Sequence, residues 1–176
     1  MDKAGHVEPE SLASAAAFQA FYAEALPVVY GYLRVRCGGS ASVAEDLTQE
    51  TFMAAVRWIK EGGRVDSPLP WVVGIAKRKL LDHFRKEERS QRRLVLAWDA
   101  GPAEDPPPWT SLTHERAMTA LAAVPSAQRA ALTLRYLDGS SVEEVAAELG
   151  KTVHATESLL ARGRESFKRA YAEDER

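Results

Sequence analysis

Residues 70–93 concentrate the side chains best suited to binding a polyanion. They include eight Lys or Arg and three acidic residues, whereas residues 1–69 have a net charge of −3 and residues 94–115 contain no Lys or Arg. The formal charge of the whole chain, −2, hides this segregation. Because a basic block between acidic segments is better explained by a local contact than by general solubility, we expect nucleic-acid phosphates to bind here.

Helical periodicity divides this basic segment into two faces. The face expected to pack inward consists of Val72, Val73, Ala76, Leu80 and Phe84. On the other face, cations can meet phosphates while Trp71 stacks on an unpaired base, although a solvated basic face with Trp71 partly buried fits the same residues equally well. The candidate DNA-binding residues of this face are Trp71, Ile75, Arg78, Lys79, Arg85, Lys86 and Arg89.

A second candidate DNA-binding feature begins at residues 141–150, whose sequence is SVEEVAAELG. Ser141 and Glu144 form a capping box, Gly150 tolerates a left-handed backbone, and Thr152 can cap the longer helix that follows. A short helix, a tight turn and a longer helix are the layout of a helix-turn-helix, whose second helix can enter a DNA major groove.

The longer helix, at about residues 153–172, is also two-sided. Its inward face is predicted to be Val153, Thr156, Leu160, Gly163, Phe167 and Tyr171. Its outer face carries hydrogen-bonding and mostly basic groups suited to base edges and phosphates, namely His154, Ser158, Arg162, Glu165 and Arg169. An ordinary amphipathic helix with a solvated charged face would show the same pattern.

Residues 42–60 present a candidate protein-binding face on a helix that should begin with a capping box of Ser42 and Glu45. The apolar side of this helix is Leu47, Thr51, Phe52, Ala54, Ala55, Trp58 and Ile59. The opposite side is Asp46, Gln49, Glu50, Met53 and Arg57. A methionine among polar groups is typical of surfaces that adapt to a partner. Single exposed apolar residues are also common on solvated faces, and the helix alone favours that simpler interpretation.

Apolar residues recur at helical spacing almost throughout the chain, which predicts an all-α protein. The other expected helices are Leu12–Arg36, which Pro27 should kink or interrupt, Pro70–Arg89, Leu112–Val124, and a helix from the Pro125-Ser126 break to Leu137. Breaks at glycine are expected at Cys37–Ser40, Glu61–Pro68 and Asp138–Gly139. Residues 97–109 combine proline, glycine and acidic side chains, so they should link two small helical domains.

The composition argues against several classes of protein. Cys37 is the only cysteine, so an intramolecular disulfide is impossible and a cysteine-based metal site is not expected. No apolar run is long enough to cross a bilayer, and the N-terminus lacks the basic start and apolar stretch of a signal peptide, so we expect a cytoplasmic protein without membrane insertion. Since no nucleophile–base arrangement, phosphate-binding glycine loop or metal-ligand cluster occurs, we expect no enzyme, no catalytic residue and no cofactor.

Four stretches occur in an order that is typical of one family. They are residues 44–52 (AEDLTQETF), residues 69–85 (LPWVVGIAKRKLLDHFR), residues 121–137 (LAAVPSAQRAALTLRYL) and the helix-turn-helix. Together they resemble the bacterial sigma-70 family, and specifically its extracytoplasmic-function (ECF, group 4) sigma factors. The resemblance implies an N-terminal tail at residues 1–13, sigma region 2 at 14–93, a flexible linker at 94–111 and sigma region 4 at 112–176.

The resemblance also implies a role for each of these faces. The polar face of residues 42–60 would bind the β and β′ subunits of core RNA polymerase. The loop at residues 61–68 and the basic helix would open the −10 promoter element and hold an everted base. The helix-turn-helix would bind the −35 element of promoter DNA through Arg129, Arg135, His154, Ser158, Arg162 and Arg169. ECF members are commonly held inactive by an anti-sigma factor, so such a partner is implied too.

Three positions of the longer C-terminal helix differ from many family members, which carry a Lys, an Arg and a valine where this chain has Glu157, Leu159 and Thr156. The −35 sequence therefore cannot be inferred from relatives. Two other functions stay open. A stand-alone helix-turn-helix regulator would bind duplex DNA without polymerase, whereas a co-sigma or decoy module would bind polymerase without reading promoters.

Overall fold

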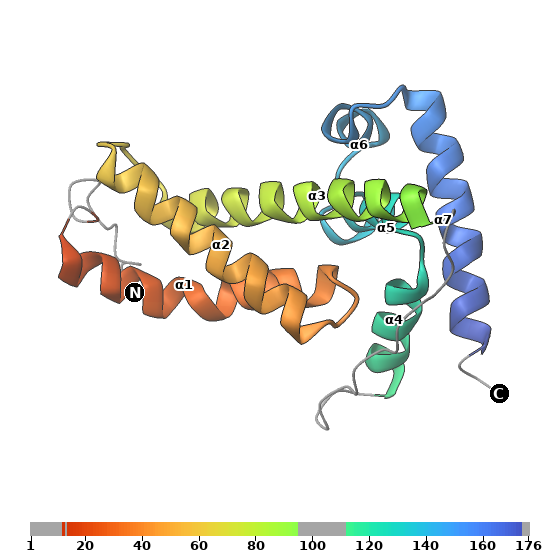
Figure 1. Ribbon diagram of the computed structural model, residues 1–176, viewed down its shortest axis with the longest axis horizontal. Coiled ribbons are helices and arrows are strands. Elements are labelled where there is room, and N and C mark those ends of the chain that lie inside the picture. Colours follow the sequence, from red (N-terminus) through yellow and green to blue (C-terminus); the bar gives the residue numbers. More distant parts are fainter. Residues whose placement is uncertain (1–11, 13, 95–111, 174–176) are drawn as a thin grey trace, which may run out of the picture. The chain divides into compact units, whose positions relative to one another are not determined.

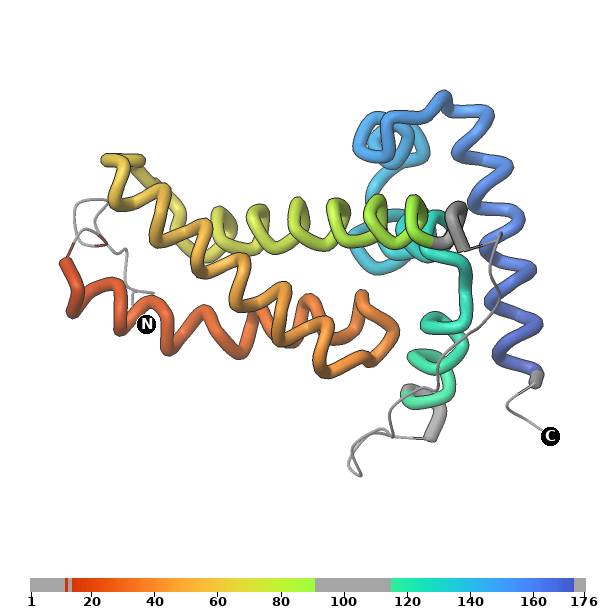
Figure 2. The backbone as a smooth tube through the Cα atoms, in the orientation of Figure 1, coloured from red at the N-terminus to blue at the C-terminus, as the bar shows by residue number. Residues whose placement is uncertain are grey.

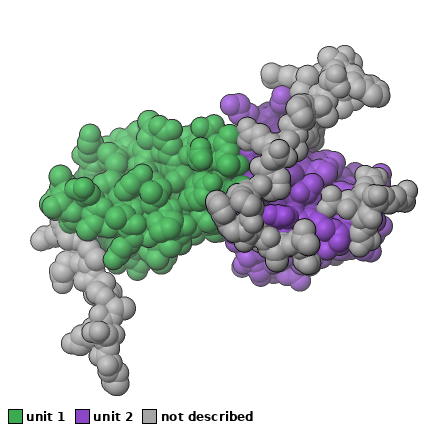
Figure 3. Space-filling view, turned by 90° about the horizontal axis from the view of Figure 1, so that it is seen from below, with its two compact units in different colours: residues 1–34, 41–79 green, residues 35–40, 80–176 purple. Residues whose placement is uncertain are grey.

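The computed structural model describes residues 12, 14–94 and 112–173, and its regular elements within these ranges are all helical (Figure 1). The all-α prediction is therefore confirmed, while the predicted linker at 97–109 lies outside the described residues. The chain divides into two compact units (Figure 3). Unit 1 holds the described residues up to Arg34 together with Ala41–Lys79, and unit 2 holds Val35–Ser40 and the described residues from Leu80 onward. The domain boundaries implied by the family resemblance stay a prediction.

Unit 1 is built from α1 (Ala15–Arg36), α2 (Ala41–Lys60) and the first part of α3 (Pro68–Leu94). Helices α1 and α2 lie side by side (Figure 2). The rings of Tyr22 and Phe52 meet edge to face with centroids 4.6 Å apart. The buried apolar residues of this unit include Phe21, Ala25, Val29, Leu33, Ala44, Leu47, Phe52, Ala55, Val65, Val72 and Ala76. The predicted apolar side of α2 thus faces the core, with the exception of Trp58, which is exposed.

Helix α1 continues through Pro27, so the predicted interruption is wrong. Proline cannot donate to the carbonyl four residues earlier, which belongs to Ala23. Both residues are exposed, so water can satisfy that carbonyl and the helix need not end. The other boundaries also shift slightly. Helix α2 begins at Ala41, one residue before the predicted cap, and α3 begins at Pro68 rather than Pro70, with proline in a first turn that needs no internal donor.

Unit 2 contains α4 (Leu112–Ala123), α5 (Ser126–Leu132), the π-helical turn η2 (Thr133–Leu137), α6 (Val142–Leu149) and α7 (Val153–Glu173). Helix α7 packs against α4, α5 and α6. The core of the unit is Leu81, Leu121, Val124, Ala131, Leu132, Leu134, Val145, Leu159 and Leu160. A single α-helix up to Leu137 was expected, but residues 133–137 form a π-helical turn, in which an N–H donates to the carbonyl five residues earlier. Asp138 N–H accordingly donates to the Thr133 carbonyl at 3.1 Å.

None of the helices in the described ranges is long and apolar enough to span a bilayer.

The helix-turn-helix geometry of α6 and α7 is confirmed by three local hydrogen bonds and one backbone torsion angle. The Ser141 hydroxyl accepts from Glu144 N–H at 3.2 Å, and the Glu144 carboxylate accepts from Ser141 N–H at 2.7 Å, which completes the capping box. Gly150 ends α6 with φ of +64°. Thr152 caps α7, because its hydroxyl accepts from Ala155 N–H at 3.2 Å. Local chemistry therefore sets where α6 ends and where α7 begins.

Gly150→Ala and Gly74→Ala should change stability in opposite directions. A Cβ meets no atom within 4 Å at either site, so neither alanine would clash with a neighbouring residue. At Gly150 the left-handed backbone should cost about 1 kcal/mol with alanine. At Gly74, inside α3, alanine should stabilise the protein by up to about 1 kcal/mol through its helix propensity. Urea unfolding of the two full-length variants measures both changes in the free energy of unfolding. If the two changes had the same sign, the cap assignment would be contradicted.

Candidate functional site

The predicted protein-binding face of α2 lies on the surface of unit 1. All five of its residues, Asp46, Gln49, Glu50, Met53 and Arg57, are exposed. Met53 has 56% of its surface accessible, a large fraction for an apolar side chain. The face is therefore exposed, as the helical projection predicts.

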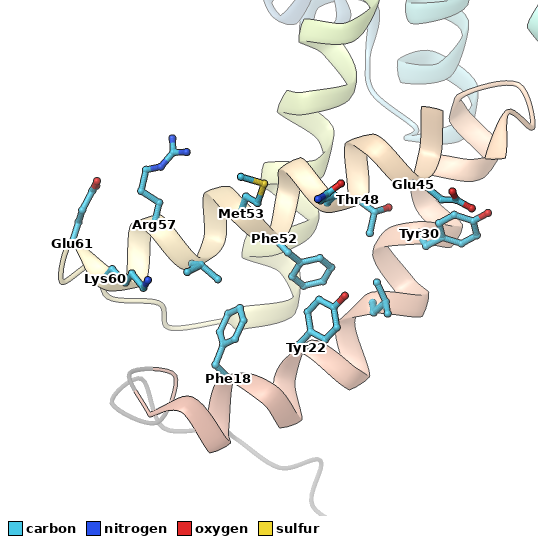
Figure 4. A pocket seen from close by; sticks show the side chains of 13 residues that line it. Phe18, Tyr22, Tyr30, Glu45, Thr48, Phe52, Met53, Arg57, Lys60 and Glu61 are labelled. Carbon is cyan, nitrogen blue, oxygen red and sulfur yellow. The ribbon is translucent and has the colours of Figure 1, made fainter. Parts of the chain in front are cut away.

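Next to this face runs a groove between α1 and α2 with a volume of about 730 Å³ (Figure 4). Helix α1 contributes one apolar or aromatic side chain per turn, namely Phe18, Tyr22, Leu26 and Tyr30. Helix α2 contributes Phe52 and Val56, and Gln49, Met53 and Arg57 belong to both the groove and the polar face. Met53 is thus the edge of an apolar groove rather than an isolated exposed residue. The projection of α2 alone could not find this groove, because α1 forms half of it.

The polar face of α2 is joined to the basic face of α3 by one ion pair. Lys79 Nζ lies 3.1 Å from Glu50 Oε2, and both side chains are partly exposed. An exposed pair of this kind contributes little stability. It does leave Lys79 partly neutralised, so Lys79 is a weaker candidate for phosphate binding than the cations without such a partner.

The rest of the predicted DNA-binding face of α3 is mostly accessible. Arg78, Arg85, Lys86 and Arg89 are exposed, whereas Trp71 and Ile75 are half-buried. The Arg85 guanidinium donates to Asp82 Oδ1 at 2.9 Å and to the Glu148 carbonyl at 2.7 Å. Arg78, Lys86 and Arg89 are consequently the best-placed cations of this helix for a polyanion.

The outer face of α7 is exposed at His154, Ser158, Arg162, Glu165 and Arg169, as predicted. The inward face is partly corrected. Thr156, Leu160 and Gly163 are buried, but Val153 is 41% exposed because it is the first residue of α7 and extends past the core. Leu159 is 7% exposed and belongs to the core of unit 2. Leucine at this position therefore serves packing in this chain.

Arg129 and Arg135 are both engaged inside unit 2. Arg129 is 7% exposed, and its Nη2 lies 2.7 Å from Glu87 Oε2 while its guanidinium stands 5.5 Å from the ring centroid of Phe84. Arg135 Nη1 donates to the Ser140 carbonyl at 2.8 Å. A DNA contact by either residue would require these bonds to break, so the structure favours a structural role for both over the predicted phosphate contacts.

Replacing Arg129 with alanine should destabilise the protein far more than replacing Arg169. The first change removes a buried guanidinium together with its ion pair to Glu87, which should cost about 2–4 kcal/mol. The second removes an exposed cation of α7 and should change stability by less than about 0.5 kcal/mol. Urea unfolding in the absence of DNA compares the two variants. Similar small effects would show that the Arg129–Glu87 pair is not a stable feature of the protein.

The structure also adds Arg164 to Arg162 and Arg169, which the sequence had already placed on the outer face of the longer C-terminal helix. Arg162, Arg164 and Arg169 of α7 line a shallow pocket of about 440 Å³ with Gln128 of α5. Arg164 Nη1 lies 3.3 Å from the Tyr136 hydroxyl. Helical projection assigned Arg164 to no face, so only the packing of α5 against α7 identifies it as a candidate anion-binding residue. Across the described ranges, no group of three or more His, Cys, Asp or Glu could hold a metal ion.

The fold and these faces define a helical protein that combines a helix-turn-helix with a separate basic helix and an exposed polar face beside an apolar groove. Residues 21–90 match the family described as Sigma-70 region 2, and residues 114–167 match Sigma-70, region 4. The chain belongs to the sigma-70 family and to its ECF group.

Three relatives illustrate this similarity. The chain is 34% identical to the ECF RNA polymerase sigma factor BldN of Streptomyces coelicolor, over 97% of this chain and 66% of BldN. It is 30% identical to the ECF RNA polymerase sigma factor SigF of Caulobacter vibrioides, over 74% of this chain and 72% of SigF. Its fold is similar to that of the sigma factor RpoE solved in complex with the anti-sigma factor NepR from Bartonella quintana, with a TM-score of 0.54 and 23% identity over 87% of this chain and 95% of that one. The chain spans just under two thirds of the length of BldN and about half that of two further relatives.

Proposed function

We propose that this protein is an alternative sigma factor that binds core RNA polymerase, recognises promoters, opens the DNA and allows transcription to initiate. The observation that carries the proposal is one chain with three separate faces: the exposed polar face of α2 beside its apolar groove, the cations of α3, and the outer face of α7. A duplex-binding regulator needs only the last of these faces. Catalysis would belong to the polymerase, and the chain would act in the cytoplasm without enzymatic activity of its own.

Within this proposal, each face has a defined contact. Asp46, Gln49, Glu50, Met53 and Arg57 would bind the β and β′ subunits of the polymerase. The loop after α2 and the α3 residues Trp71, Ile75, Arg78, Lys79, Arg85, Lys86 and Arg89 would act at the −10 element. The residues His154, Ser158, Arg162 and Arg169 of α7 would bind the −35 element. The buried Arg129 and the bonded Arg135 would support α7 from within unit 2.

The deciding experiment is in vitro transcription with purified core polymerase, the full-length chain and a library of genomic fragments. The proposal predicts specific initiation only when both proteins are present, and the mapped start sites would supply both promoter elements. Absence of specific initiation would defeat it. Sequence-specific binding of duplex DNA by the chain alone would favour the stand-alone regulator, and polymerase binding without initiation would favour a co-sigma or decoy.

An anti-sigma factor is a further part of the proposal, since members of this group are commonly controlled in that way. Purification of the chain from native cells should recover a small inhibitory protein that blocks transcription in the reconstituted assay. Recovery of polymerase without such an inhibitor, under every growth condition tested, would count against it.

A further inference from the structure

The polar face of α2 and the basic face of α3 meet at an ion pair. Lys79 Nζ lies 3.1 Å from Glu50 Oε2, although the two residues are 29 positions apart in the chain. Both belong to unit 1. Glu50 is part of the face proposed to bind polymerase, and Lys79 is part of the face proposed to bind DNA. A partner that binds either face therefore meets one member of this pair.

Both members of this pair can change partners. The side chain of Lys79 is 33% exposed and that of Glu50 is 56% exposed, so neither charge needs the other to offset burial in a core. The attraction within an exposed pair of this kind changes an equilibrium by about 2–5-fold. A lysine ammonium is also a compact charge on a flexible stem, which can turn from one oxygen to another. The pair is thus weak enough to exchange partners and strong enough to affect binding.

The pair also places a negative charge where a DNA phosphate would approach Lys79. While Glu50 accepts from Lys79, the ammonium is partly neutralised and the carboxylate repels a second anion nearby. A cation of a partner that binds Glu50 removes both obstacles, because it offsets the carboxylate and leaves the ammonium without its acceptor. Partner binding at the face of α2 and phosphate binding at α3 should therefore favour each other.

We propose that Glu50 and Lys79 couple the two binding faces by exchanging partners, an inference that rests on the proposed roles of α2 and α3. In the chain alone, Glu50 holds Lys79 and weakens its contact with DNA. In the holoenzyme, a Lys or Arg side chain of the polymerase pairs with Glu50, and Lys79 binds a phosphate of the −10 strand instead. The coupling is reciprocal, so DNA bound at Lys79 raises the affinity for polymerase by the same factor.

The first measurement uses the full-length chain without polymerase and a labelled single strand with the sequence of a mapped −10 element. Glu50→Gln removes the charge that holds Lys79 and should strengthen binding of this strand by about 2–5-fold at low salt. One additional phosphate contact should also steepen the plot of the logarithm of the binding constant against that of the salt concentration, by about 0.7 in slope. A gain of affinity cannot result from misfolding of the variant.

The matched control is Glu24→Gln, which removes one exposed carboxylate from α1 of the same unit. It changes the net charge by the same amount as Glu50→Gln, so it should strengthen binding only slightly and leave the salt slope as in the natural chain. Combined with Lys79→Met, Glu50→Gln should lose its effect, because no ammonium is left to release. Equal gains from Glu50→Gln and Glu24→Gln would overturn the inference.

The second measurement repeats the binding with holoenzyme assembled at saturating core polymerase. Lys79→Met should weaken DNA binding by about 2–5-fold in the holoenzyme, where Lys79 contacts the strand, and by much less in the chain alone, where Glu50 holds it. Equal losses in the two states would show that polymerase does not release Lys79, so the inference would be wrong while the proposed function stands. If no holoenzyme forms or no promoter can be mapped, the proposed function fails first and the inference with it.

Discussion

Asp46→Arg is expected to lower the affinity of the chain for core RNA polymerase by on the order of 100-fold or more, without unfolding unit 1. Asp46 is exposed on the polar face of α2, so its replacement disturbs no buried contact. A like charge forced against a complementary interface costs several kcal/mol, and roughly 1.4 kcal/mol corresponds to a tenfold change in affinity. Glu50 is a less direct choice, because its carboxylate also pairs with Lys79 of α3.

The matched control is Glu24→Arg, which makes the same charge change at an exposed position of α1. Binding of each variant to immobilised core polymerase would be measured at two salt concentrations. Asp46→Arg should lose affinity at both, whereas Glu24→Arg should stay close to the natural chain. Equal losses from the two variants would mean that overall charge, and not the face of α2, determines binding.

Local sequence signals predicted the parts of this protein whose geometry depends on a few neighbouring residues. The capping box of Ser141 and Glu144 and the left-handed Gly150 are of this kind, because their partners lie within a few positions of them. The same holds for the general division of α2 and α3 into apolar and polar faces. Each of these features depends on helical periodicity or on one turn of backbone.

The misplaced residues are those whose surroundings come from another element. Helical projection placed Trp58 on the buried side of α2, but the helix ends before the Gly62-Gly63 turn and the ring covers that turn instead of entering the core. Arg129 was expected to contact DNA because the family resemblance implied a phosphate contact there. Glu87 and Phe84, more than forty positions earlier in the chain, provide its partners. No single-helix projection contains that information.

The α1–α2 groove changes the interpretation of the protein-binding face. Sequence alone favoured a solvated face with one stray methionine, since nothing in α2 indicated a neighbouring apolar surface. The spacing of Phe18, Tyr22, Leu26 and Tyr30 along α1 places one side chain per turn along the same side of the groove. A partner that binds the polar face can therefore also bury apolar surface, which is where protein interfaces gain most of their affinity.

Arg162→Ala is expected to reduce initiation by about 10-fold or more at promoters that depend on a −35 element. Arg162 lies on the exposed side of α7, two turns from the capped N-terminus, and its Nε donates to the Ser158 carbonyl at 3.3 Å. This bond directs the guanidinium toward the N-terminal end of α7. A lost bidentate base contact would cost about 1–3 kcal/mol and relax specificity at one base pair, whereas a lost phosphate contact would weaken all sequences alike.

Lys168→Ala is the control for this prediction, because Lys168 is an exposed cation of the same helix whose Nζ lies 3.2 Å from Glu165. Both variants would be assayed on the mapped promoter and on a set of single-base changes across its −35 element. A base contact by Arg162 predicts that one of these changes loses its effect in Arg162→Ala only. The slope of the logarithm of the binding constant against the logarithm of the salt concentration gives the alternative. If this slope becomes shallower by about one unit with no change in base preference, Arg162 binds a phosphate. Equal behaviour of the two variants would remove Arg162 from the DNA interface.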